Sequence, residues 1–138
     1  MNTIDQLNAE FALTQAHGAA LSFIQGEADL PIAVLRTAHA EARVMLQGAQ
    51  IIHYRVGAQP PIIWVGEEAK AIPGKSLRGG VPVCWPWFGA GAEGQPAHGF
   101  ARNLDWQVAG SKADDDSVTL ILELLPSEAS RKYWPHDF

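Results

Sequence analysis

Two arginines and a histidine lie in a segment that is otherwise rich in glycine and aromatic residues. Arg78 opens the run Arg-Gly-Gly-Val-Pro-Val-Cys-Trp-Pro-Trp-Phe-Gly, and His98 and Arg102 belong to the later run His-Gly-Phe-Ala-Arg-Asn. Glycines let a backbone approach a ligand, tryptophans offer flat apolar faces to the C–H face of a sugar ring, and guanidinium groups match phosphate oxygens. The mixture predicts a pocket for a polar, anionic, ring-shaped ligand. Composition alone leaves an alternative open, a buried loop whose arginines bind carbonyls and whose tryptophans are core.

The elements that position these residues belong to a chain of 138 residues, 47% apolar and 18% charged, which predicts one domain over residues 1–138. The formal charge of −5 comes without a basic run, which argues against nucleic acid or an anionic membrane as a partner. Cys84 is the only cysteine, so an intrachain disulfide is excluded. The first residues resemble no export signal and no apolar stretch has membrane-spanning length, so we expect a cytoplasmic protein.

Short apolar groups separated by turn-forming residues predict a mainly β chain. Before residue 70, the expected strands are residues 19–24, 32–35, 42–46, 50–56 and 62–65. In the third of these, Ala42, Val44 and Leu46 occupy alternate positions, which predicts that their face alone is buried. A helix is expected only within residues 3–15.

Glycine and proline dominate residues 66–96, which predicts an ordered but irregular loop of the length that functional loops often have. After it, residues 104–109 and 117–124 predict a hairpin across residues 111–116, with apolar side chains at alternate positions on one face of its second strand. The three aspartates at 114–116 are expected to form a solvated turn rather than a metal site.

The glycine-rich runs fit the patterns R-G-G-[IV]-P-[IV]-C-W-P-W-F-G and P-x-H-G-F-A-R-N-x-x-W, and residues 134–138 fit W-P-x-x-F. Together they resemble the hexose-6-phosphate mutarotases, the glucose-6-phosphate 1-epimerase branch of the aldose 1-epimerase superfamily. The resemblance implies an antiparallel β-sandwich of the galactose mutarotase-like type, of which this chain is an N-terminal, incomplete part. It also implies interconversion of the α and β anomers of glucose 6-phosphate or related hexose 6-phosphates, with no metal or organic cofactor.

The resemblance assigns substrate contacts to three residues of this chain. Arg78 matches the family's first phosphate-binding arginine, and Arg102 matches the arginine of the H-G-F-A-R motif. His98 matches a histidine that can hydrogen-bond a sugar hydroxyl, although a structural histidine that locks the loop is the alternative. Some members carry a glutamine just before this histidine, where this chain has Ala97, so the preferred hexose stays open.

Mutarotation needs a base at the anomeric hydroxyl and an acid at the ring oxygen. The family's acid is a histidine followed by an aromatic residue on a later strand, and its base is a glutamate near the C-terminus; neither motif occurs here. The catalytic residues are therefore expected beyond residue 138, and this chain is expected to recognise a hexose 6-phosphate and to self-associate through uncovered sheet surfaces. A non-catalytic sugar-phosphate binding module and an inactive truncated product are the alternatives.

Overall fold

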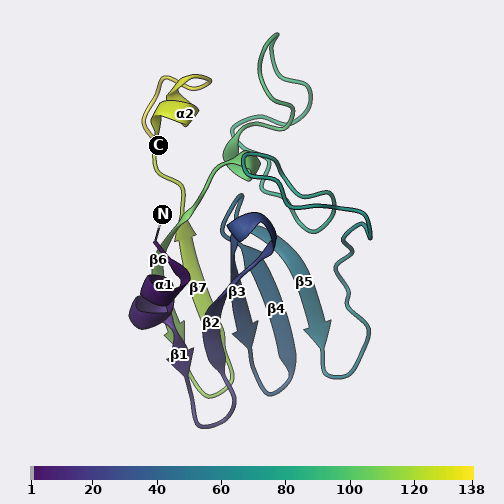
Figure 1. The fold of residues 1–138 in the computed structure, drawn as a ribbon, viewed down its shortest axis with the longest axis vertical. Coiled ribbons are helices and arrows are strands. Elements are labelled where there is room, and N and C mark those ends of the chain that lie inside the picture. Colours follow the sequence, from purple (N-terminus) through teal and green to yellow (C-terminus); the bar gives the residue numbers. More distant parts are fainter. Residues whose placement is uncertain (1) are drawn as a thin grey trace.

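The computed structural model describes residues 2–138, which form mainly antiparallel strands in two sheets (Figure 1). Neighbouring strands of the larger sheet follow one another along the chain, and every pair is antiparallel. This sheet comprises β1 (Leu13–Thr14), β2 (Ala20–Gln25), β3 (Pro31–Arg36), β4 (Ala40–Met45) and β5 (Gln50–Val56). The smaller sheet is the hairpin of β6 (Gln107–Ala113) and β7 (Val118–Glu123). The predicted all-β, antiparallel class is confirmed.

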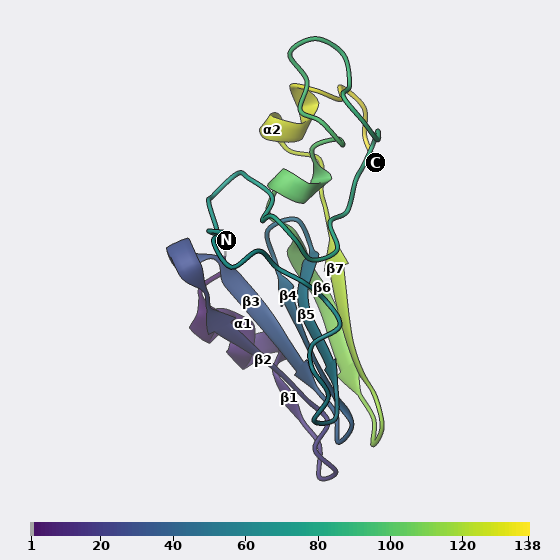
Figure 2. The same ribbon diagram turned by 90° about the vertical axis from the view of Figure 1, so that its right-hand side faces the viewer.

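The hairpin forms a second layer over the larger sheet (Figure 2). Leu21, Phe23 and Leu46 of the first layer are each at most 3% exposed. Leu120 and Leu122 of β7 pack against this cluster from the second layer, as the predicted apolar face of the hairpin requires. Because full burial of such a side chain contributes about 1.5–3 kcal/mol, this contact holds the two layers together.

Helix α1 (Ile4–Phe11) is shorter than the helix predicted within residues 3–15. A reciprocal cap starts it: the Gln6 N–H donates to the Thr3 hydroxyl at 3.2 Å, and the Thr3 N–H donates to the Gln6 side chain at 2.8 Å. The chain then becomes extended and β1 pairs with β2. Pairing with an existing strand thus overrides the helical pattern of the last residues.

The strand predicted at residues 62–65 is wrong. Ile62 and Trp64 are 66% and 65% exposed, and the segment makes only scattered backbone contacts, among them the Ile62 N–H to the Tyr54 carbonyl at 2.8 Å. Further along the edge of β5, the Ile51 carbonyl accepts the N–H of Val81 at 2.9 Å, so residues 62–65 form no continuous ladder with β5.

Burial along β4 also departs from the predicted one-sided pattern. Met45, expected on the exposed face, is 3% exposed, as is its neighbour Leu46. The β4–β5 register shifts between Arg43 and Val44, but the extra residue is Ile52 of β5, so β4 keeps its alternation and Met45 and Leu46 face opposite sides of the sheet. Both faces of the sheet are therefore covered at this end of the strand.

The turn between β6 and β7 is tighter than the predicted 111–116, because β6 continues to its end at Ala113. The Asp114 carboxylate accepts the N–H groups of Asp116 at 3.1 Å and Ser117 at 2.9 Å. The pKa of Asp114 lies below its ordinary value because of these bonds, of which the one from the Asp116 N–H has the largest effect. The aspartates form the solvated turn that the sequence predicts.

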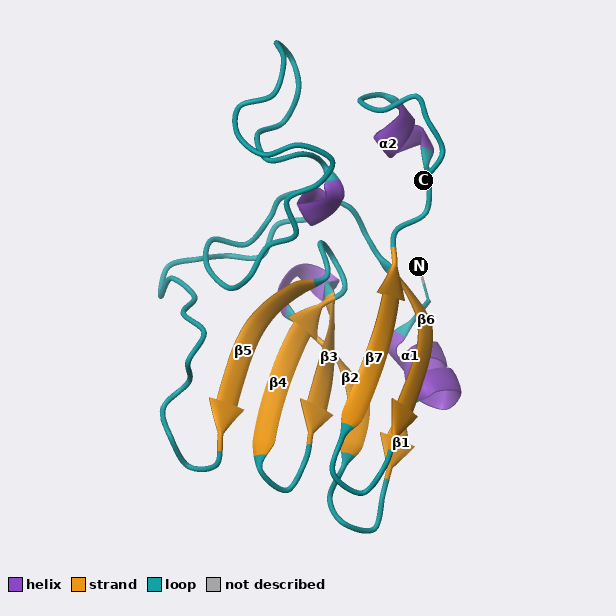
Figure 3. Cartoon of the chain, turned by 180° about the vertical axis from the view of Figure 1, so that it is seen from behind, coloured by secondary structure: helices purple, strands orange, loops and turns teal. Residues whose placement is uncertain are grey.

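The long irregular segments gather at one end of the sheets (Figures 1 and 3). They include most of residues 66–106, with the short helix η2 (Ala101–Asn103), and the C-terminal helix α2 (Glu128–Arg131). The turn η1 (Glu27–Asp29) joins β2 to β3. In residues 2–138, no helix has the length and apolar character needed to cross a membrane.

Candidate functional site

Two buried glutamines at the β4–β5 turn bind different parts of the loop, Gln50 the residues that flank Arg78 and Gln47 the segment 72–75 before them. Gln47 is 3% exposed and Gln50 is 1% exposed. The Gln47 amide donates to two carbonyls within residues 72–75, and the Gln50 amide donates to two within residues 77–79. A buried amide is stable only when bonded in this way, so each glutamine ties an irregular segment to the sheet. Neither glutamine was predicted from the sequence.

Arg78 is exposed and lines a hollow of about 590 Å³ beside Trp64. Within residues 2–138, no hydrogen bond or ion pair engages its guanidinium. The hollow thus offers an apolar ring face beside a free cation, the combination predicted for a sugar phosphate. Glu67 and Glu68 line the same hollow, and their charge opposes an anion there.

His98 is held firmly by its own loop. Its ring Nδ1 accepts the backbone N–H of Gly89 at 3.0 Å, and its backbone N–H donates to the Gly89 carbonyl at 2.7 Å. The centroid of its ring lies 4.6 Å from that of Phe88. Its φ of 62° is unusual for a residue other than glycine. Because Nδ1 accepts, a neutral ring carries its proton on Nε2, which can donate to a ligand. His98 therefore makes the loop-locking contacts of the structural alternative, while its ring Nε2 has no hydrogen-bond partner within residues 2–138.

Arg102 is partly buried in η2. One Nη2 hydrogen bond of 2.9 Å reaches the Ala97 carbonyl, and the Nε group is buried with no partner within the described residues. The turn at Gly48 presses against it, since a Cβ there would lie 2.4 Å from the Arg102 carbonyl oxygen. Gly48 also has a φ of 77°, so this close approach requires glycine.

The three predicted residues fall into two linked groups. His98 and Arg102 lie in the same loop, and the Arg102 side chain donates to the carbonyl of Ala97, the residue before His98. Arg78 lies in a separate segment, and the Ser76 N–H joins the two by donating to the Asn103 side chain at 3.0 Å.

The aromatic residues of the two motifs mostly pack on one another. Phe100 is 1% exposed, and its ring centroid lies 5.7 Å from that of Trp85 and 6.0 Å from that of Trp87. Phe138 packs on Trp85 at 4.7 Å. Phe88, by contrast, is 81% exposed. The tryptophans of the first motif therefore pack within an aromatic cluster, but Trp85 is still 36% exposed and, with Phe138, lines a hollow of about 370 Å³.

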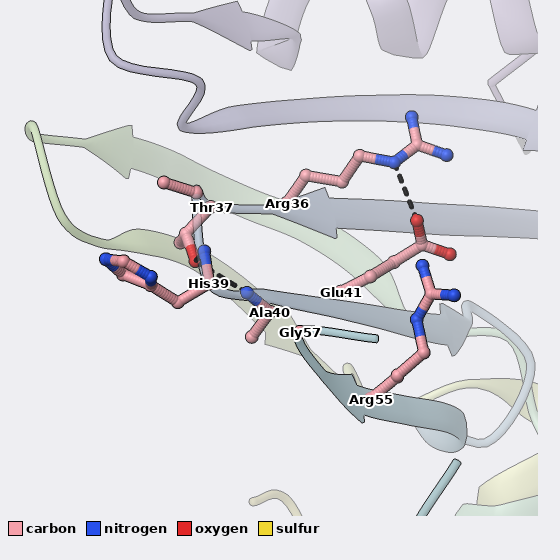
Figure 4. Close-up of a pocket in the computed structure, with 8 residues that line it drawn as sticks. Arg36, Thr37, His39, Ala40, Glu41, Arg55 and Gly57 are labelled. Carbon is pink, nitrogen blue, oxygen red and sulfur yellow. Dashed lines mark hydrogen bonds and ion pairs between the residues drawn. The ribbon is translucent and has the colours of Figure 1, made fainter. Parts of the chain in front are cut away.

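A second hollow, of about 320 Å³, lies at the β3–β4 turn, at the opposite end of the sheet (Figure 4). Arg36 and Glu41 line it, and the Glu41 carboxylate accepts a hydrogen bond from Arg36 Nε at 2.7 Å; Nη2 of the neighbouring Arg43 lies 3.1 Å from its other oxygen. The pKa of Glu41 lies below its ordinary value, mainly because of the hydrogen bond from Arg36 and to a smaller extent because of Arg43. A carboxylate so stabilised stays ionised, so this cluster is an ion-pair network across strands and a poor proton donor. Residues 2–138 also contain no cluster of histidine, cysteine and acidic side chains suited to a metal ion.

Comparison with known proteins gives a consistent result. The family Aldose 1-epimerase matches residues 31–138. A candidate glucose-6-phosphate 1-epimerase of Salmonella typhimurium is 45% identical over 111 residues, which are 80% of this chain and 38% of that protein. The Escherichia coli protein of the same name is 42% identical over the same length. The crystal structure of YeaD from Salmonella typhimurium, titled a candidate mutarotase, superposes with a TM-score of 0.78 at 38% identity, covering 97% of this chain and 45% of that one.

The chain therefore spans less than half the length of these relatives, which fits an N-terminal portion. Its architecture is that of the galactose mutarotase-like antiparallel sandwich, as predicted. The family match covers most of its residues, including the segments that hold Arg78, His98 and Arg102. The chain belongs to the aldose 1-epimerase family.

Proposed function

We propose that the complete protein interconverts the α and β anomers of a hexose 6-phosphate, glucose 6-phosphate first, and that this chain supplies the substrate recognition. The observation that carries the proposal is the state of Arg78: its backbone is anchored to the sheet, while its guanidinium is free beside the exposed ring of Trp64. The family and the names of the relatives support the same reaction class.

The role proposed for each residue follows from the hydrogen-bond donors that it does not use within the protein. Arg78 binds the phosphate with its unengaged fork. Arg102 has one Nη2 bond to the protein and an unpartnered Nε, so it retains donors for the ligand. His98 donates its Nε2–H to a sugar hydroxyl, because Gly89 occupies its other nitrogen.

The chemistry is ring opening by general acid and base catalysis. A base takes the proton of the anomeric hydroxyl while an acid protonates the ring oxygen, the bond from that oxygen to the anomeric carbon breaks, and the aldehyde rotates and recloses. Each catalytic group contributes about 10²–10⁴-fold. We assign both to residues beyond 138. In support, the ion pairs between a histidine and a carboxylate within residues 2–138, His17 with Asp115 and His53 with Glu41, include none of the three predicted residues.

A binding experiment tests the recognition role. Glucose 6-phosphate, glucose and inorganic phosphate are titrated separately into the 138-residue chain, and binding is followed by the amide shifts of residues 78, 98 and 102. We expect glucose 6-phosphate to bind most tightly and to shift all three. Equal affinity for glucose and glucose 6-phosphate would overturn the proposed function.

We further propose that residues 1–138 are part of one sandwich domain and that the protein is cytoplasmic. The shared core of the two layers supports the first proposal. A single free thiol, Cys84, supports the second, because reduced cysteine is usual in the cytoplasm. Fractionation of the source cells tests the location.

A further inference from the structure

The side chain of Gln50 is fully engaged with the backbone on both sides of Arg78. Its Nε2 donates to the Leu77 carbonyl at 2.9 Å and to the Gly79 carbonyl at 2.6 Å. Its Oε1 accepts the Leu77 N–H at 3.2 Å and the Ser76 hydroxyl at 3.3 Å. These four bonds use the whole capacity of an amide, which has two N–H donors and two lone pairs.

The opposite side of this segment is pinned as well. The Arg78 carbonyl accepts the Gly66 N–H at 3.2 Å, and the Gly80 N–H donates to the Trp64 carbonyl at 2.7 Å. A Cβ on Gly79 would lie 2.6 Å from the Cα of Val65. The backbone of Arg78 is therefore clamped between Gln50 and the segment at 64–66, while its side chain extends outward.

The same network reaches the second arginine. Ser76, which bonds to Gln50 through its hydroxyl, donates its backbone N–H to Asn103. Asn103 immediately follows Arg102 in η2. A chain of bonds from Gln50 through Ser76 and Asn103 thus connects the segments of both arginines.

We propose that Gln50 is a positioning residue for recognition of the substrate's phosphate. It fixes the backbone of Arg78 and, through Ser76 and Asn103, the position of the Arg78 segment relative to Arg102. This inference rests on the proposed function. Gln50 itself is buried and does not touch the ligand. Its effect comes from preorganisation, because a ligand that meets a fixed backbone orders only one side chain.

Gln47 provides a matched control. It is buried to a similar degree in the same turn and clamps residues 72–75 rather than the backbone beside Arg78. Gln50→Leu and Gln47→Leu each remove a bonded buried amide, so both lower stability. Only the first releases the backbone of Arg78.

The experiment compares the affinity of the full 138-residue chain for glucose 6-phosphate with that for glucose, using NMR titration of wild type, Gln50→Leu and Gln47→Leu. We expect Gln50→Leu to lower the ratio of the two affinities by about tenfold, the loss typical of one charge-assisted contact. Gln47→Leu should keep the ratio within about twofold. A wild-type ratio in Gln50→Leu, or equal losses in both variants, would overturn the inference.

A second variant and a second readout separate this outcome from misfolding and from failure of the proposed function. Gln50→Glu keeps the size but cannot donate to Leu77 and Gly79, so it should also lower the ratio. Hydrogen exchange of the Leu77 amide, which donates to the Gln50 Oε1, should accelerate in Gln50→Leu and not in Gln47→Leu, whereas Gln50→Glu keeps an acceptor for this amide. A wild-type chain that does not prefer the phosphorylated sugar overturns the proposed function, whereas unchanged Leu77 exchange in Gln50→Leu overturns the clamp alone.

Discussion

The backbone N–H of Ser76 lies 3.0 Å from the side-chain oxygen of Asn103 and joins the two loop segments that hold the predicted arginines. Arg78 follows Ser76 by two positions and Arg102 directly precedes Asn103. The sheet supports both segments, through Gln50 on one side and through the close contact of Gly48 with Arg102 on the other. Two cationic side chains far apart in sequence are thereby carried by one connected framework.

Removal of either arginine should weaken binding of the phosphorylated sugar. We expect Arg78→Ala or Arg102→Ala to cost about 1.5–3 kcal/mol for glucose 6-phosphate, the value of a hydrogen bond to a charged group. Isothermal titration of both sugars measures it. Arg36→Ala, at the opposite end of the sheet, should change neither affinity. Equal weakening for glucose would mean that the arginines shape the pocket without binding the phosphate.

Neutralising the acidic side of the Arg78 hollow should have the opposite effect. Glu67 and Glu68 line this hollow, and their carboxylates repel a phosphate there. The double variant Glu67→Gln, Glu68→Gln should bind glucose 6-phosphate several-fold more tightly at low ionic strength, with the gain shrinking as salt screens the charges. Titrations at low and high salt test this. Tighter binding of glucose as well would point to a change of pocket shape.

Two glycines with similar backbone conformations should respond differently to alanine. Gly99 and Gly94 have φ values of 72° and 79°, but a Cβ on Gly99 would lie 1.9 Å from the Trp85 carbonyl oxygen, whereas Gly94 has nothing within 4 Å. Gly94→Ala should cost only the left-handed strain of about 1–2 kcal/mol. Gly99→Ala adds a backbone clash and should cost about 4 kcal/mol or more. Urea unfolding measures both, and similar losses would contradict the tight packing of Trp85 on this turn.

Much of the fold is legible in the sequence, whereas the anchoring of the site is not. The strands near residues 20–25, 31–36 and 50–56 appear because apolar groups and turn formers alternate locally. The hydrogen bonds of Gln50 could not be predicted from local sequence patterns, because its partners lie in a backbone segment that only folding brings opposite it. A polar residue on each side of the Gly48-Ala49 turn, in an otherwise apolar stretch, was the one available signal.

The error at residues 62–65 has the same origin. The apolar run at Ile62 and Trp64 matches a buried strand, but its backbone hydrogen bonds are divided between Tyr54 of β5 and Gly80 of the loop. Local pattern predicts which residues can form strands, and long-range hydrogen bonds decide which do.

The Glu41 network should make stability depend on pH. Its arginine partners lower the folded pKa of Glu41 below the ordinary value of 4.5, so its stabilisation is complete above that value and is lost as pH falls through the lower, folded pKa. Glu41→Gln should therefore reduce the free energy of unfolding at pH 7 by about 0.5–1 kcal/mol, because the arginines are partly exposed. Urea unfolding at neutral and strongly acidic pH tests this, and a difference that persists in acid would contradict the mechanism.

We propose that the chain self-associates through its smaller sheet. Within residues 2–138 that sheet has only β6 and β7, and Ile121 on β7 is 48% exposed. Sedimentation velocity over a range of concentrations should show reversible association, and Ile121→Lys should shift it toward monomer, because a lysine beside a sheet edge opposes pairing. A compact monomer at all concentrations would contradict the proposal.

The most direct test of the central claim is the rate of α-to-β interconversion of glucose 6-phosphate, measured by NMR exchange spectroscopy with and without the 138-residue chain. If these residues recognise the substrate while the acid and base lie elsewhere, the rate stays at its spontaneous value even when the sugar phosphate is bound. Acceleration above that value would contradict this division of roles and would place an acid and a base within residues 1–138.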